Sequence, residues 1–100
     1  MPHVLVVHDS ESVRSELARE LQAEGFQVSD VDSASGAVRE IWGGSFDAVL
    51  VSERLTMNGT SLEDHLKTIA PEIVTLSIGR ESPARLARKV TDILDGAVAA

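Results

Sequence analysis

A serine, a histidine and an aspartate follow two strongly apolar segments of the chain. His8 and Asp9 come directly after the valine- and leucine-rich residues 4–7, and Ser52 comes directly after residues 48–51. These residue types serve as base, orienting acid and nucleophile in one class of acyl-transfer enzymes. The glycine-flanked turn that exposes the serine in α/β enzymes of this class is absent, because Ser52 lies between a valine and a glutamate. We therefore predict that the three residues are not a catalytic triad.

Residue content excludes several other kinds of chemistry. The chain has no cysteine, which excludes disulfides, zinc–thiolate sites, iron–sulfur clusters and cysteine nucleophiles. Residues 8–11, His-Asp-Ser-Glu, contain two carboxylates and no glycine, which argues against a dinucleotide-binding turn or a phosphate-binding loop. We predict that the chain is not an enzyme and has neither a cofactor nor a bound metal.

Apolar periodicity predicts four strand–helix units that position these polar residues. Continuous or alternating apolar residues predict strands at 4–7, 26–31, 46–51 and 73–78. Apolar residues at helical spacing predict helices at 11–24, 34–42, 62–69 and 83–95. Ser10, Ser33 and Ser82 are the expected N-caps, and residues 60–63 have the spacing of a capping box.

Strict alternation of strands and helices with short connections predicts a parallel sheet with helices on both faces. Residues 1–100 are therefore expected to form a single α/β domain, a doubly wound parallel sheet of about four strands and four helices. In such sheets ligands bind outside the carboxyl ends of the strands. The segments to consider are thus residues 8–11, 52–54 and 78–80.

The chain is acidic, with 16 Asp and Glu against 9 Lys and Arg and a formal net charge of −7. This charge repels phosphate backbones, so nucleic acid is not expected as a partner. Residues 1–64 hold 12 acids and 4 bases, whereas residues 65–100 hold 4 acids and 5 bases, so an acidic partner is expected to dock on the C-terminal part. No apolar run is long enough to span a membrane and no basic segment precedes residues 4–7, so a cytoplasmic protein without membrane contact is expected.

The first half of the chain combines an apolar strand, the pair His8 and Asp9, and an arginine followed by apolar residues at fixed offsets. The arginine is Arg14, and the residues that follow it in the pattern are Leu17, Leu21, Gly25, Phe26, Val28, Ala37, Val38 and Ile41. The pattern ends at residues 47–52, Asp-Ala-Val-Leu-Val-Ser. In this spacing, residues 3–52 resemble the receiver domain of bacterial two-component response regulators. The resemblance implies the flavodoxin-like fold of the chemotaxis regulators, here shortened.

The resemblance also implies a phosphorylation site that this sequence has partly lost. The family holds Mg²⁺ with two neighbouring acids after the first strand and an aspartate after the third, which accepts the phosphoryl group. Those positions are His8, Asp9 and Ser52 here, and Ser77 stands where the family places a hydroxyl that bonds the phosphoryl group. No lysine matches the family's invariant cation, and one helix and the fifth strand are missing. The pocket of His8, Asp9, Ser52, Glu53 and Ser77 is therefore expected to be degenerate.

Three residues allow two interpretations each. Asp9 is either a remnant metal ligand or a cap of the following helix, and capping is favoured. Glu53 either imitates the charge of a phosphorylated aspartate or is a solvated loop carboxylate, and the second is favoured. Trp42 either anchors a partner or covers the end of the core, and the core is favoured.

The chain is therefore predicted to be a phosphorylation-independent signalling or protein-interaction module, a pseudo-receiver with protein partners. Its candidate partner-binding residues are the cations of the last helix, Arg85, Arg88 and Lys89, although such cations often only solvate a helix. The alternative is a still-switchable receiver or a small hydrolase that uses Asp9, His8 and Ser52.

The missing fifth strand has structural consequences. In the family's sheet order, 2-1-3-4, the strand at 73–78 becomes an edge with unpaired backbone groups, so self-association, docking of another chain or a cover by the last helix is expected. The last helix is expected to lie beside the first. Its apolar residues near Val13 and Leu17 are then Leu86, Val90, Ile93 and Leu94.

Overall fold

The computed structural model describes residues 2–99, with side chains described for residues 2–94. The elements in chain order are β1 (His3–Val7), α1 (Glu11–Ala23), β2 (Gln27–Val31), α2 (Ala34–Gly43), β3 (Ala48–Ser52), β4 (Thr56–Met57), β5 (Thr60–Ser61), α3 (Leu62–Ile69), β6 (Val74–Ile78) and α4 (Pro83–Ala99). The main sheet has the order β2-β1-β3-β6, with all neighbouring strands parallel. The predicted doubly wound α/β fold and its strand order are confirmed.

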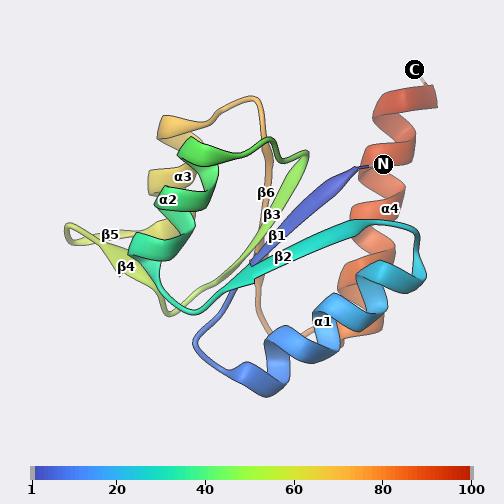
Figure 1. Cartoon of the computed structure of the whole chain (residues 1–100), viewed down its shortest axis with the longest axis horizontal. Coiled ribbons are helices and arrows are strands. Elements are labelled where there is room, and N and C mark those ends of the chain that lie inside the picture. Colours follow the sequence, from blue (N-terminus) through green and yellow to red (C-terminus); the bar gives the residue numbers. More distant parts are fainter. Residues whose placement is uncertain (1, 100) are drawn as a thin grey trace.

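Two helices cover each face of the sheet, α1 and α4 on one side and α2 and α3 on the other (Figure 1). Side chains of the central strands alternate between the two sides. In β1, Val4 and Val6 belong to the apolar cluster under α1 and α4, whereas Leu5 and Val7 belong to the cluster under α2 and α3. Strands buried on both faces have no polar alternation, which explains the continuous apolar runs at residues 4–7 and 48–51.

Serine side chains begin the helices. Ser10, Ser33 and Ser82 each accept a hydrogen bond from a backbone N–H three residues later, as predicted. The predicted capping box at residues 60–63 is wrong by one residue, because Ser61 rather than Thr60 caps α3. Each such cap satisfies a backbone donor that the first turn of a helix leaves without a partner.

The shift at α3 has its cause in a two-stranded hairpin, β4–β5, that the predicted elements do not include. Thr60 pairs with Met57 across this hairpin, so it belongs to a strand and the helix begins after it. Asn58 and Gly59 form the turn with φ values of 54° and 80°. Asn-Gly is the strongest short signal for a two-residue hairpin turn, because both residues tolerate positive φ.

α4 packs beside α1, which confirms its predicted position. Leu86 and Val90 are buried in the same cluster as Leu17, and Leu94 packs against that cluster. Ile93 is half-buried and is not part of the cluster. Fully burying a leucine or valine contributes about 1.5–3 kcal/mol, so α4 is a main source of stability on this face. Within residues 2–99 no helix combines the length and apolar character needed to cross a membrane.

Trp42 does not cover the core, contrary to the sequence-based prediction. It is 72% exposed, near the C-terminal end of α2. The neighbouring Ile41 packs against the core cluster together with Phe46. Consecutive helix residues point about 100° apart, so Ile41 and Trp42 do not face the sheet together. Trp42 instead lines a cavity of about 310 Å³ between the ends of α2 and α3.

Introducing a charge on the buried side of α4 is expected to unfold the domain. Leu86→Asp places a carboxylate without a partner among apolar side chains, and such burial costs several kcal/mol against a total stability of about 5–15 kcal/mol. Arg88→Glu on the exposed side of the same helix is the matched control and should change stability by less than about 0.5 kcal/mol. Urea unfolding followed by circular dichroism measures both. A folded Leu86→Asp variant with an unchanged midpoint contradicts the packing of α4.

Candidate functional site

A cavity of about 450 Å³ opens at the carboxyl ends of β1, β3 and β6. It is the place where the sequence predicted the degenerate pocket. The residues that line it come from three segments of the chain and differ in part from the predicted set: His8, Ser10, Val13, Ser52, Glu53, Arg54, Ile78, Gly79 and Arg80.

Strand alternation explains why His8 and Ser52 share this cavity. Val4 and Val6 of β1 and Leu50 of β3 point to the α1 and α4 side of the sheet. Since side chains alternate along a strand, the residues two positions further on, His8 and Ser52, point to the same side. The cavity is therefore a continuation of the α1 and α4 side beyond the end of the apolar cluster.

The His8 side chain makes its hydrogen bond with the local backbone rather than with another side chain of the cavity. Its Nδ1 accepts a hydrogen bond of 2.9 Å from the Ser10 N–H. The same Nδ1 lies 3.1 Å from Asp9 Oδ1. Nδ1 that accepts from a backbone N–H has no proton to donate to a carboxylate, whereas a catalytic triad requires that donation. The His8–Asp9 contact therefore does not have the geometry of a triad.

Ser52 is buried, with 3% of its surface exposed. Its hydroxyl accepts a hydrogen bond of 3.3 Å from the backbone N–H of Arg54. Among the side-chain hydrogen bonds of residues 2–94, none joins Ser52 to His8. The hydroxyl is thus used in the turn after β3 and has no adjacent base that activates it.

Asp9 does not cap α1, so the favoured interpretation of this residue is wrong. Ser10 is the N-cap, because its hydroxyl accepts a hydrogen bond from the backbone N–H of Val13. The Asp9 side chain is 56% exposed and lies against His8. Asp9 is also not among the residues that line the cavity. Asp9 therefore lies beside the cavity rather than among its lining residues.

Ser77 is not in the pocket, which corrects a second part of the predicted set. Ser77 pairs with Val51, whereas Ile78 pairs with Ser52. Ile78 belongs to the apolar cluster under α1 and α4, so the alternate residue Ser77 points to the α2 and α3 side. The position opposite Ser52 is thus occupied by a buried isoleucine that offers no hydroxyl.

Among the residues whose side chains are described, Glu53 is the one carboxylate that lines the cavity. It is an exposed loop residue that lines the same cavity as Ser52. Its side chain lies over Gly79, where an added Cβ would come within 3.1 Å of Glu53 Oε1. Arg54 and Arg80 line the same cavity, and their positive charge opposes a cation there. Among the described residues, no group of three or more His, Asp and Glu is placed to hold a metal ion.

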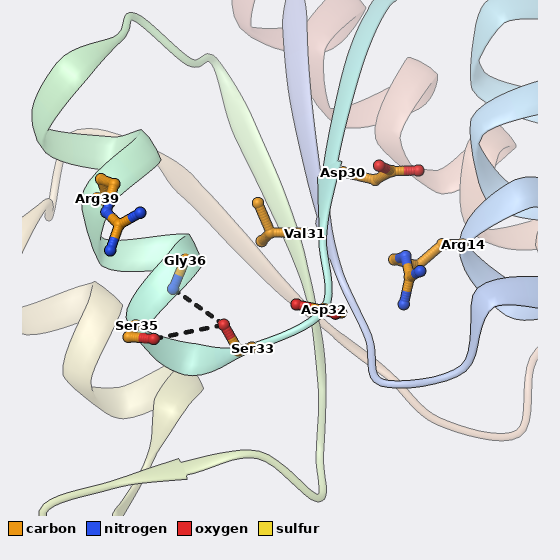
Figure 2. A pocket seen from close by; sticks show the side chains of 8 residues that line it. All are labelled: Arg14, Asp30, Val31, Asp32, Ser33, Ser35, Gly36 and Arg39. Carbon is orange, nitrogen blue, oxygen red and sulfur yellow. Dashed lines mark hydrogen bonds between the residues drawn. The ribbon is translucent and has the colours of Figure 1, made fainter.

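A second cavity, of about 420 Å³, lies at the carboxyl end of β2 and was not part of the predicted site. Figure 2 shows its lining, with Arg39 coming from α2 on one side of β2 and Arg14 from α1 on the other. Arg14 Nη1 donates to the carbonyl oxygen of His8 at 2.8 Å. Asp30 and Asp32 also line this cavity. It therefore contains both positive and negative side chains and does not form a positively charged site for an anion.

The predicted partner-binding cations are all exposed on α4. Arg88 Nε lies 3.7 Å from Asp92, and Lys89 Nζ lies 2.9 Å from Glu81. Ion pairs between exposed side chains contribute only about 0–1 kcal/mol, so these groups remain available to a partner. The structure thus places them together on one face, separate from the cavity at the strand ends.

Solved structures are similar to this chain over almost its whole length, although no family model and no curated protein matches it. A CheY-like response regulator receiver domain protein from Methanospirillum hungatei superposes with a TM-score of 0.79 at 16% identity, over 96% of this chain and 95% of that chain. The response regulator TrrA from Thermotoga maritima in complex with Mg²⁺-BeF superposes with a TM-score of 0.74 at 18% identity, over 93% and 99% of the two chains. The chain has the receiver fold.

A further receiver-fold structure is a complex of the histidine kinase ThkA with TrrA. It superposes with a TM-score of 0.66 at 22% identity, over 87% of this chain and 80% of that chain. At these identities the likeness establishes the fold, and the chemistry of the pocket depends on its own side chains.

Magnesium is expected not to bind at the strand ends of this receiver fold. Calcium and magnesium sites need several oxygen ligands, and the pocket has one carboxylate, from Glu53, beside two arginines. Isothermal titration with millimolar Mg²⁺ should give only the heat of dilution. The double variant His8→Asp/Ser52→Asp adds two carboxylates on the cavity side and should gain weak, saturable heat. Saturable heat from the unsubstituted chain contradicts the assignment.

Proposed function

We propose that the chain is a pseudo-receiver, a protein-interaction module of two-component signalling that acts without phosphorylation. The observation that carries the proposal is the side-chain content of the strand-end cavity. By its resemblance to receiver domains Ser52 stands at the position of the phosphoacceptor, and Ile78 pairs opposite it in the sheet. Neither side chain can form an acyl phosphate or bind a phosphoryl oxygen through charge.

The energetics of phosphoryl transfer support this proposal. The transferred group carries negative charge, which a bound metal ion must offset. Asp9 lies outside the cavity and Glu53 is its one carboxylate, so the metal lacks ligands. A serine phosphate is an ordinary ester without the reactive acyl linkage, and Ser52 is buried and bonded to the turn.

A protein is the class of partner that the similar structures and the exposed surface of α4 support best. One similar structure is a response regulator in complex with a histidine kinase, so this fold can present a surface to another protein. The exposed cations Arg85, Arg88 and Lys89 on α4 are the proposed contact residues. They lie in the part of the chain that has a slight excess of bases, whereas residues 1–64 are strongly acidic. The partner surface is therefore proposed to be acidic.

The alternative, a switchable receiver or a small hydrolase using Asp9, His8 and Ser52, has weaker support. It needs Ser52 activated by His8 and His8 oriented by Asp9. The hydrogen bonds of both Ser52 and His8 are made instead to backbone N–H groups. No specific contact of the pocket favours this function.

Incubation with Mg²⁺ and acetyl phosphate, followed by intact-mass measurement, tests the proposed function. The chain is expected to keep its mass, while an active receiver domain treated in parallel gains one phosphoryl group. A stoichiometric adduct on the chain, lost in the Ser52→Ala variant, would establish phosphorylation at Ser52 and overturn the proposal. An adduct that persists in Ser52→Ala would place the acceptor elsewhere and overturn it equally.

A further inference from the structure

The edge of β6 is the feature that the proposed function leaves unexplained. We infer that β6 pairs with β6 of a second copy of the chain, antiparallel and centred on Leu76, so that the two sheets become continuous. The inference names one partner of the module, and it depends on the backbone of β6 rather than on the inert pocket.

The outward backbone groups of β6 can be identified from the sheet register. Val74 N–H donates to the carbonyl oxygen of Asp47, so the backbone groups of Val74 point to β3. In a parallel ladder, alternate residues of a strand point to the same neighbour. Leu76 and Ile78 therefore also point to β3, whereas the N–H and C=O groups of Thr75 and Ser77 point outward. Within residues 2–99 no strand lies beyond β6.

The two edge strands of the sheet, β2 and β6, differ in how well they are protected against pairing with another chain. Charged side chains on an edge strand discourage pairing with another chain. The β2 edge carries the exposed Asp30, and Asp32 follows its last residue. β6, with the sequence Val-Thr-Leu-Ser-Ile, carries no charge, and its first four side chains are only half-buried. The β6 edge is therefore the one available for pairing.

The sequence of β6 is self-complementary about Leu76. An antiparallel pair centred there places Thr75 opposite Ser77 of the second copy, and Ser77 opposite Thr75. These are the residues with outward backbone groups, so each such pair exchanges two N–H···O=C bonds. Val74 then faces Ile78 of the second copy on the apolar side, and Leu76 faces Leu76. Hydroxyl-bearing residues thus meet each other, and apolar residues meet each other.

Charges beyond the ends of β6 agree with this register. The same centre places Glu72 of one copy opposite Arg80 of the second, and the symmetry repeats the pair. Both side chains are exposed, and neither takes part in an ion pair within the described part of the chain. A shift of the centre to Thr75 or Ser77 places Arg80 opposite Ala70 or Val74 and loses the pairing. Opposite charges in symmetric positions favour a second copy over an unrelated strand.

Sedimentation velocity over a range of concentrations, with charge-reversal variants, tests the inference. The chain should show a reversible dimer. Glu72→Arg and Arg80→Glu each create two like-charge contacts and should each weaken dimerisation roughly tenfold. The double variant Glu72→Arg/Arg80→Glu restores opposite charges and should return the dissociation constant to that of the unsubstituted chain. Both positions are exposed, so circular dichroism should show an unchanged fold in all variants.

Amide hydrogen exchange followed by NMR provides the second measurement. The amides of Leu76 and Ile78 should be protected at every concentration, because they bond to β3. Those of Thr75 and Ser77 should exchange fast in the dilute chain and become protected as the dimer forms. A monomer at all concentrations overturns the inference, as does a dimer in which Thr75 and Ser77 remain unprotected. A dimer that the double variant does not restore overturns the register. None of these results depends on phosphorylation.

Discussion

The structure depends on the burial of both faces of two central strands. β1 and β3 contribute apolar side chains to both sides of the sheet, and residues 4–7 and 48–51 are almost completely buried. Such strands are stable only when helices cover each face. α2 and α3 cover one face, and α1 needs α4 beside it to cover the other (Figure 1). The position of α4, with Leu86 and Val90 inward and the cations outward, follows from this requirement.

The same alternation of side chains determines what the strand ends can do. A residue at the end of a strand points to the cavity or away from it according to its parity along the strand. His8 and Ser52 therefore reach the cavity, Ser77 does not, and Ile78 occupies the place opposite Ser52. The register of β3 and β6 thus keeps the Ser77 hydroxyl out of the pocket, whereas His8 and Ser52 reach the pocket but carry no carboxylate. The receiver fold remains available as a scaffold for surfaces on α4 and along β6.

Much of the fold could be predicted from the sequence, because long apolar patterns and serine caps are local signals. The four strands of the main sheet and the place of α4 are confirmed, as is the strand order that the resemblance to receiver domains implies. The β4–β5 hairpin could have been found from Asn58-Gly59, a local turn signal. Ser77 and Trp42 could not be placed in the same way, because the register between β3 and β6 and the rotation of α2 are set by tertiary packing. Asp9 was misplaced for another reason. Asp9 and Ser10 are adjacent and both residue types cap helices, and Ser10 is the one that caps α1.

The most direct test of the inert pocket is an NMR titration with Mg²⁺ and beryllofluoride, an analogue of the phosphoryl group. Ser52, Glu53 and Gly79 line the cavity at the strand ends, so their backbone amides report on binding there. Because the cavity has no acceptor carboxylate at Ser52 and too few ligands for the metal, these three resonances are expected to keep their positions throughout the titration. A saturable, concerted shift of the three amides, with further shifts in β6, would contradict the account and show a receiver that still responds to phosphorylation.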